Sequence, residues 1–311
     1  MTTPDPLEDT VDLIPVARFS EAFFASPSKR FLVKFGASSH TGNVRSANED
    51  HYAVVRRRRT SELILTDLSP SDLVLGDDSS YALIVADGMG GARFGEFASR
   101  LALRRMFELA QQATSWVMKF TDMEVQQIRE RVDAYVRKIQ ATLREYTEAD
   151  PALAGMGTTW TSAHLLLPHV LIVHIGDSRA YLLHEGELCQ ITHDETLAQA
   201  FIDTGMEPKD VRRFGHILLN NFGSDTDKVT AQVHQLQMSV GDQLLLCTDG
   251  LSDMIADEDI ATILLHDTPP QVTCDELINE ALKNGGKDNV TVVVASVVSE
   301  DRSATSSAVD A

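Results

Sequence analysis

The sequence is poor in cysteine, and the few cysteines it has are isolated. Cys189, Cys247 and Cys274 are far apart in the chain, and none belongs to a CxxC pair. This spacing excludes a disulfide framework of the kind that stabilises small secreted domains, and it excludes a cysteine-rich zinc site. Isolated cysteines are typical of proteins in a reducing compartment, so we expect the protein to be cytoplasmic.

The sequence also lacks a long apolar run and an N-terminal targeting signal. The longest apolar stretch, 165–175, is interrupted by Pro168, His169 and His174 and is too short to span a bilayer. Residues 1–10 contain acidic side chains and no basic segment before an apolar run. We therefore expect no secretory signal and no membrane partner.

Positive charge is scarce. The chain has 27 lysines and arginines against 46 aspartates and glutamates, which gives a formal net charge of −19. Nucleic acids and anionic membrane surfaces both require a basic face, so neither is expected as the main partner. An acidic chain of this kind is better suited to bind divalent cations. We also expect the protein to be a monomer.

The length of 311 residues, with 43% hydrophobic and 23% charged residues, is that of a globular protein with one large core. Strand-like and helix-like segments occur in separate blocks, which indicates an α+β fold with mostly antiparallel sheets. The expected segments are a tail over 1–30 with a short helix near Phe19–Ala25, a core domain over 31–298, an insertion over about 57–79, a flap over about 192–229, and a tail over 299–311.

Short apolar runs bounded by turn residues predict strands, and apolar residues recurring every three or four positions predict helices. The expected helices are 94–120 and 125–143. The expected strands are 31–37, 51–56, 83–86, 159–167, 170–175, 180–184, 188–191, 229–236, 243–247 and 290–298.

One expected strand ends in a lone carboxylate that is followed by glycines. The run 83–86 leads directly into Asp87, and Gly88, Gly90 and Gly91 come next. Glycines allow positive φ angles and a close approach of the backbone to a ligand, so the Gly88 carbonyl could itself be a ligand. The same pattern would also fit a strand-to-helix turn in which Asp87 caps the next helix. On this stretch alone the two interpretations are equally good.

Three further acidic segments share this setting at the tip of an apolar strand. Asp249 follows the run 244–247 and precedes a glycine, Asp288 precedes the strand at 290, and Glu49 and Asp50 precede the strand at 51. Carboxylates packed together repel one another unless a cation neutralises them. Each aspartate taken alone also fits a turn, but the repetition favours a metal site. An all-oxygen ligand set favours Mg²⁺ or Mn²⁺ over zinc.

Arg45 lies in the same expected loop as Asp50. Its planar guanidinium suits a phosphate group, although a surface position is the simpler interpretation of a single arginine. Two metal ions beside an arginine can hydrolyse a phosphate ester, because the metals activate water while the guanidinium holds the anionic group.

These residues resemble those of the metal-dependent serine/threonine protein phosphatases of type 2C, the PPM family, and of its bacterial members in particular. The matching segments follow the family's order and cover residues 31–298. They are Arg45-Ser46-Ala47-Asn48-Glu49-Asp50, Val85-Ala86-Asp87-Gly88-Met89-Gly90-Gly91, Gly95-Glu96 with Ala98-Ser99, Met156-Gly157-Thr158-Thr159, Ile175-Gly176-Asp177-Ser178-Arg179-Ala180, Thr248-Asp249-Gly250-Leu251 with Asp253, and Asp288-Asn289-Val290-Thr291.

The resemblance implies a two-layer antiparallel β-sandwich flanked by α-helices on both sides, with a two-metal site at one end. It implies that Asp87 bridges both ions, that Asp249 and Asp288 complete the first, and that the Gly88 carbonyl binds the second, where Glu49 and Asp50 act through bound water. It also implies a third, weaker ion held by Asp177 with Asp249 and Asp253. Arg45 matches the residue that binds the phosphate.

The implied activity is hydrolysis of phosphoserine and phosphothreonine in proteins by a hydroxide that bridges two Mn²⁺ or Mg²⁺ ions, with Arg45, Asp87 and Asp249 as the catalytic residues. The implied partners are phosphorylated targets of a serine/threonine kinase. Eukaryotic relatives have a histidine where this chain has Met89, and none of the ten histidines falls on a family position. Two alternatives share the fold: a catalytically inactive regulatory or binding module, and a phosphatase of small metabolites.

Overall fold

The computed structural model describes residues 31–59, 78–90, 94–112, 123–224 and 228–299. Several predictions of local structure therefore lie outside the described residues. They are the N-terminal tail with its helix near Phe19–Ala25, the middle of the expected insertion, the end of the first expected helix, and the C-terminal tail.

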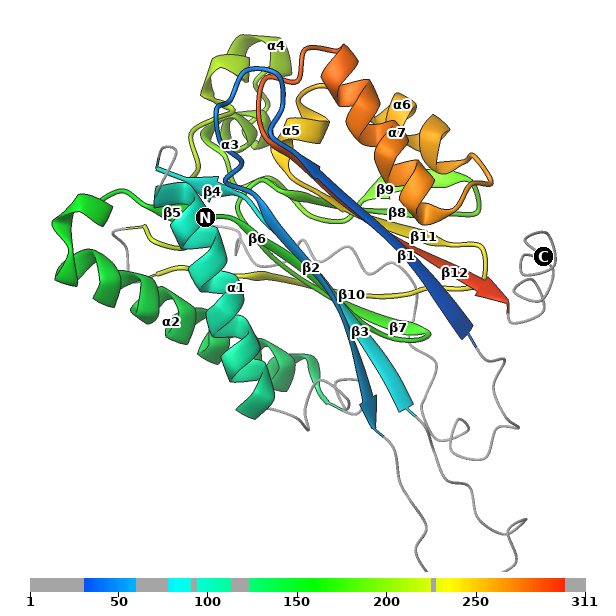
Figure 1. Ribbon diagram of the computed structural model, residues 1–311, viewed down its shortest axis with the longest axis horizontal. Helices are drawn as coiled ribbons and strands as arrows, with labels where there is room; N and C mark the ends of the chain where they lie inside the picture. The colour runs from blue at the N-terminus through cyan, green and yellow to red at the C-terminus, as the bar shows by residue number, and fades with distance from the viewer. Residues whose placement is uncertain (1–30, 60–77, 91–93, 113–122, 225–227, 300–311) are drawn as a thin grey trace, which may run out of the picture.

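Two five-stranded antiparallel sheets form the centre of the fold (Figure 1). The first sheet, in spatial order, consists of β1 (Phe31–His40), β12 (Val290–Ser299), β11 (Gln243–Cys247), β8 (Arg179–His184) and β9 (Glu187–Gln190). The second consists of β10 (Gln232–Gln237), β7 (His169–Ile175), β6 (Trp160–Leu166), β3 (Asp78–Ala86) and β2 (His51–Arg59). Short strands β4 (Gly88–Met89) and β5 (Gly157–Thr158) pair separately.

Alternation along the strands builds three hydrophobic layers. On β3, Leu83 and Val85 pack between the sheets, whereas Ile84 and Ala86 belong to the cluster under the helices. Strand β11 behaves in the same way, because Leu246 lies between the sheets and Leu245 faces helices on the other side. Successive side chains of a strand point to opposite faces, so a run that is apolar throughout must be buried on both.

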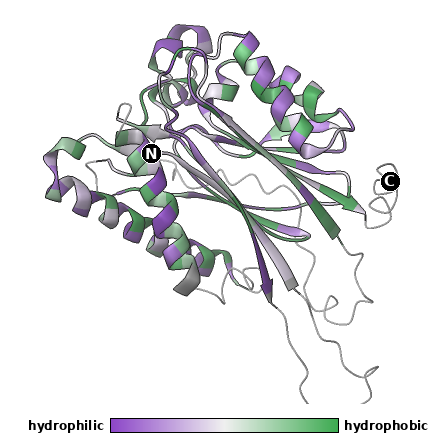
Figure 2. Cartoon of the chain, in the orientation of Figure 1, coloured by the Kyte–Doolittle hydropathy of each residue, from purple (hydrophilic) through white to green (hydrophobic). Residues whose placement is uncertain are grey.

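Helices cover the outer face of each sheet, and Figure 2 shows apolar and polar residues alternating along them. Helices α1 (Phe94–Gln112) and α2 (Val125–Ala149) cover the sheet that contains β3. The small α5 (Asp249–Ser252), α6 (Asp257–Leu264) and α7 (Pro270–Lys283) cover the sheet that contains β11. The expected α+β sandwich with helices on both sides is thus confirmed.

Helices α6 and α7 are absent from the expected elements, although the sequence contains their signal. In α7 the buried residues recur at helical spacing: Pro270, Thr273, Cys274, Leu277, Ile278 and Ala281. Polar residues lie between these buried positions and dilute the apolar stripe in the sequence. Packing of this apolar stripe against β1 and β12 stabilises the helix in the fold.

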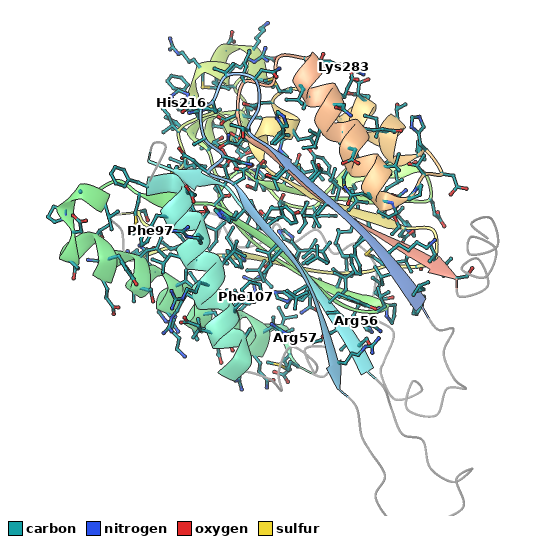
Figure 3. The ribbon with its side chains drawn as sticks, viewed as in Figure 1. Arg56, Arg57, Phe97, Phe107, His216 and Lys283 are labelled. Carbon is teal, nitrogen blue, oxygen red and sulfur yellow. The ribbon has the colours of Figure 1, made fainter. Side chains whose placement is uncertain are left out.

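The two strands that flank the expected insertion are longer than predicted. Strand β2 continues through Arg57 to Arg59, and β3 begins at Asp78, so both ends of the segment 57–79 are strand. Arg56 is exposed and its guanidinium lies over the ring of Tyr81, 5.6 Å from the centroid. Figure 3 shows this arginine-rich strand end far from His216, which lies in the expected flap.

The segment 192–229, which the sequence analysis expects to be a flap, contains two short helices, α3 (Leu197–Asp203) and α4 (Pro208–Val211), followed by a 3₁₀ turn over Arg212–Phe214. Its end is anchored, because Phe222 is buried and exchanges backbone hydrogen bonds of 3.0 Å with Thr158. The strand expected at 229–236 begins later, at Gln232. Among the described residues, no helix has the length and apolar character needed to cross a membrane.

Truncation of a side chain between the sheets tests this packing. We expect Leu246→Ala to lower the free energy of unfolding by about 2–5 kcal/mol, because the fully buried side chain leaves a cavity that the two sheets cannot close. Leu265→Ala is the matched control, since that side chain is 55% exposed and its loss should stay within about 0.5 kcal/mol. Equal effects in urea denaturation would contradict the assigned core.

Candidate metal and phosphate site

The predicted acidic residues come together at one end of the sandwich. Asp50 precedes β2 and Asp87 follows β3 in one sheet, whereas Asp249 follows β11 and Asp288 precedes β12 in the other. Asp177 precedes β8 in that second sheet. Figure 1 shows the β1–β2 connection beside α5 and beside the connection between α7 and β12. A hydrogen bond joins these two connections, because the backbone amide of Asn43 in the first donates to the carbonyl oxygen of Gly286 in the second at 2.7 Å.

Asp50 is fixed by hydroxyl groups from the opposite sheet. Its Oδ2 accepts hydrogen bonds from Thr248 (2.9 Å) and Thr291 (2.7 Å), and all three residues are buried. Its Oδ1 is buried without a hydrogen-bond partner. Sequence reasoning assigned no role to the two threonines. A polar residue at the end of an otherwise apolar strand was the available signal.

Asn289 holds the loop that carries Glu49. Its side-chain oxygen accepts from the Glu49 amide at 2.8 Å, and its Nδ2 donates to the carbonyls of Thr41 (2.9 Å) and Ala47 (2.8 Å). Ser99 on α1 donates to the Glu49 carbonyl at 2.7 Å. The loop before β2 is thereby tied both to the residue after Asp288 and to α1.

The glycines near Asp87 permit a close approach of three segments. A Cβ atom on Gly88 would collide with the carbonyl of Gly95 and would lie 2.7 Å from the carbonyl oxygen of Glu49. A Cβ atom on Gly95 would collide with the Glu49 carboxylate. Positive φ, which the sequence suggested for these glycines, occurs at Gly90 (+119°) and not at Gly88, while Gly91 lies outside the described residues.

Asp87 does not cap a helix, since α1 begins at Phe94. Its backbone amide donates to Thr159 Oγ1 at 3.0 Å, and its carbonyl accepts from the Thr159 amide at 2.9 Å. Thr159 Oγ1 also lies 2.8 Å from Ser178 Oγ. The peptide of Asp87 is therefore connected to the turn that contains Asp177.

Burial and mutual repulsion raise the pKa values of these carboxyl groups. Burial raises the pKa of Asp87 well above its usual range, and the charges of Asp50, Asp249 and Asp177 add to the rise. The pKa of Asp249 is raised for the same reasons. The pKa of Asp50 rises to about 6 and that of Asp177 to about 7, chiefly through burial. A cation would favour the charged forms that this environment disfavours.

The remaining predicted residues lie at the periphery. Asp253 is exposed, and its amide donates to the Asp249 carbonyl at 2.8 Å. Partial desolvation of its carboxyl group nevertheless raises its pKa, and the nearby charge of Asp194 adds to the rise. Arg45 is 56% exposed at its side chain, and its Nη2 lies 2.5 Å from Asp288 Oδ2. The predicted phosphate ligand and a predicted metal ligand thus form an ion pair with each other.

The donor set fits a hard divalent cation. In the ranges that the structure describes, no group of three or more Asp, Glu, His or Cys side chains is arranged so that it could hold a metal ion without rearrangement. The carboxylates nevertheless lie close enough to raise one another's pKa values, and Oδ1 of Asp50 and Oδ1 of Asp249 are buried without hydrogen-bond partners. Buried oxygens without donors are those that a cation would satisfy.

A family model described as protein phosphatase 2C matches residues 70–284. The chain belongs to this family. The match begins after β1 and β2, but both strands are integral to the two sheets, and the loop between them carries Arg45, Glu49 and Asp50. The resemblance found in the sequence is therefore confirmed.

Relatives in the family are bacterial serine/threonine phosphatases. The chain is 38% identical over 232 residues to the serine/threonine protein phosphatase PstP of Mycobacterium tuberculosis, covering 72% of this chain and 43% of PstP. It thus spans less than half the length of PstP. It is 33% identical over 225 residues to the serine/threonine phosphatase stp of Listeria monocytogenes, covering 70% of this chain and 84% of the relative.

The fold is also similar to that of solved structures in the family. The catalytic domain of PstP, in complex with two manganese ions, superposes with a TM-score of 0.66 at 33% identity, covering 86% of this chain and 100% of that domain. The serine/threonine phosphatase Stp1 of Staphylococcus aureus has a TM-score of 0.70 at 25% identity, covering 85% of this chain and 95% of Stp1.

The raised pKa values predict how the stability of the metal-free protein depends on pH. A carboxyl group with a raised pKa in the folded state contributes stability at low pH that is lost as the pH rises through that pKa, here through about 6 for Asp50 and about 7 for Asp177. The melting temperature of chelator-treated protein should therefore fall between pH 5 and 8, and Mn²⁺ should restore it at pH 8.

Two variants control for the titration of other groups. Asp87→Asn removes one of the repelling charges and should flatten the pH dependence, whereas Asp275→Asn, on the exposed face of α7, should leave it unchanged. A melting temperature that stays constant across this pH range and does not respond to Mn²⁺ would contradict the described electrostatics.

Proposed function

We propose that this chain is a metal-dependent protein serine/threonine phosphatase that hydrolyses phosphoserine and phosphothreonine in proteins. The observation that carries the proposal is the convergence of Asp50, Asp87 and Asp249 from both sheets, with two buried oxygens that lack donors. The names of the relatives support the same activity. The inactive alternative is not favoured, because every expected acidic residue of the core site is present.

In this proposal two Mn²⁺ or Mg²⁺ ions, when bound, activate water and stabilise charge on the phosphate. Asp87, Asp249, Asp288 and the carbonyl of Gly88 would hold these ions, with Asp87 as a ligand common to both. Glu49 and Asp50 would act on the ion beside Gly88 through bound water. The close packing of Gly88 against Gly95 and Glu49 leaves no room for a Cβ atom, so this position requires glycine.

Arg45 holds the phosphate of the substrate in this proposal. One of its nitrogens, Nη2, donates to Asp288, and the other N–H groups of the guanidinium can donate to a phosphate. Met89 cannot donate a proton to the leaving group, and we assign that proton to water.

The wider assignments follow from the family. We propose that residues 31–298 form the catalytic domain, that 192–229 is a flap over the site, and that Asp177 and Asp253 with Asp249 hold a third, weaker ion. The substrates would be proteins phosphorylated by a serine/threonine kinase. The enzyme would be a monomer and would act in the cytoplasm. The three cysteines support this location, since all are free.

The decisive variant is Asp87→Asn, which keeps the shape of the side chain and removes its charge. We expect kcat/KM for Mn²⁺-dependent release of phosphate from a phosphothreonine peptide to fall at least about 100-fold. Replacing a residue that only orients a metal ligand typically lowers metal affinity or activity about 10- to 100-fold, and Asp87 is proposed as a ligand itself. Asp275→Asn, on the exposed face of α7, is the control and should retain full activity.

Retention of activity by Asp87→Asn in a preparation free of other phosphatases would refute the metal assignment. A parallel assay with sugar phosphates separates this proposal from the small-molecule alternative, since the proposed enzyme should turn over phosphopeptides far faster.

A further inference from the structure

Two consecutive acidic residues at the start of the flap, Asp194 and Glu195, hold both ends of the turn that contains Asp177. At the first end, the amide of Gly176 donates to Glu195 Oε2 at 2.8 Å, and the amide of Glu195 donates back to the Gly176 carbonyl at 2.7 Å. At the other end, Arg179 donates from Nε to Asp194 Oδ1 at 2.9 Å and from Nη2 to Oδ2 at 2.7 Å. Bidentate pairs of this kind fix geometry as well as charge.

Glu195 also binds later parts of the flap. Its Oε2 accepts a second hydrogen bond from Asn220 Nδ2 at 2.7 Å, and its Oε1 accepts from Gln232 Nε2 on β10 at 3.2 Å. Its carbonyl accepts from the amide of Leu219 at 2.8 Å. One side chain therefore joins the beginning of the flap, the end of the flap and the Asp177 turn.

The turn requires a glycine at position 176. Gly176 has φ of +106°, and a Cβ atom there would lie 2.7 Å from Thr159 Cγ2. The buried His174 places its Nε2 3.0 Å from the Gly176 carbonyl, which adds a further contact to the same peptide. Thr159 is also hydrogen-bonded to Ser178 and to the Asp87 amide, so a shift of this turn would displace the backbone of Asp87.

We propose that Glu195 is a positioning residue that couples the flap to Asp177, so that the flap conformation and the affinity for a divalent cation at Asp177 change together. The cation half of this inference rests on the proposed function. The carboxylate suits the role because it only accepts hydrogen bonds and all three side-chain contacts to it are N–H donors. A glutamine would turn an amide group toward one of these donors, and an alanine would leave all three without their acceptor.

The test compares Glu195→Gln, Glu195→Ala and a control, Asp203→Asn. Asp203 is an exposed carboxylate of the same flap, and its side chain is bonded to His193 and Gln199, both of which lie in this segment. Two quantities are measured: hydrogen exchange of the Gly176 amide in chelator-treated protein, and Mn²⁺ binding by calorimetry. The first reads the hydrogen bond directly and needs neither metal nor activity.

We expect exchange at Gly176 to be at least about tenfold faster in Glu195→Ala, intermediate in Glu195→Gln and unchanged in Asp203→Asn. The weak class of Mn²⁺ sites should lose about tenfold in affinity in Glu195→Ala, within the 10- to 100-fold typical of residues that orient metal ligands. The tight class should be unchanged, and the glutamine variant should recover part of the loss.

Unchanged exchange at Gly176 in Glu195→Ala would overturn the proposal. Equal acceleration at Gly176 and at the core amide of Leu245 would also overturn it, because that result indicates general destabilisation. A wild-type protein that binds no Mn²⁺ would contradict the proposed function and with it the cation half of the inference. The exchange measurement would still decide whether Glu195 fixes the turn.

Discussion

Repulsion between buried carboxylates is the constraint on which the site depends. Asp50, Asp87 and Asp249 lie close enough to raise one another's pKa values, and each would be more stable in water. Thr248 and Thr291 hold the Asp50 carboxylate by hydrogen bonds, while Asp87 and Asp249 are carried to the same place by the buried strands β3 and β11. The apolar layer between the two sheets fixes how far apart their strand ends lie, and with them the carboxylates that follow or precede those strands.

This arrangement explains why the site is divided between the two sheets. Neither sheet alone brings four acidic strand ends to one place, whereas two packed antiparallel sheets do so at one end of the sandwich. The loops that join the elements are then fixed individually, by Asn289 for the loop carrying Glu49 and by Glu195 for the turn carrying Asp177. A rigid core thus positions side chains that would otherwise separate.

The sequence was sufficient to predict the strands and the acidic residues at their tips, because continuous apolar runs such as 83–86 and 244–247 have few alternatives to a buried strand. It did not reveal α7, whose apolar stripe is diluted by polar residues. It also could not reveal that Gly88 is required by its neighbours Gly95 and Glu49. Contacts between segments distant in sequence leave no local pattern, so only the packed fold shows them.

The central claim is that two divalent cations lie at this end of the sandwich and share Asp87. The most direct measurement is an anomalous-difference map, recorded at the manganese absorption edge, from crystals grown with Mn²⁺. The account predicts two peaks that both contact the Asp87 carboxylate, one beside Asp249 and Asp288 and one beside the Gly88 carbonyl. Peaks that lie elsewhere, or a single peak that does not touch Asp87, would contradict it.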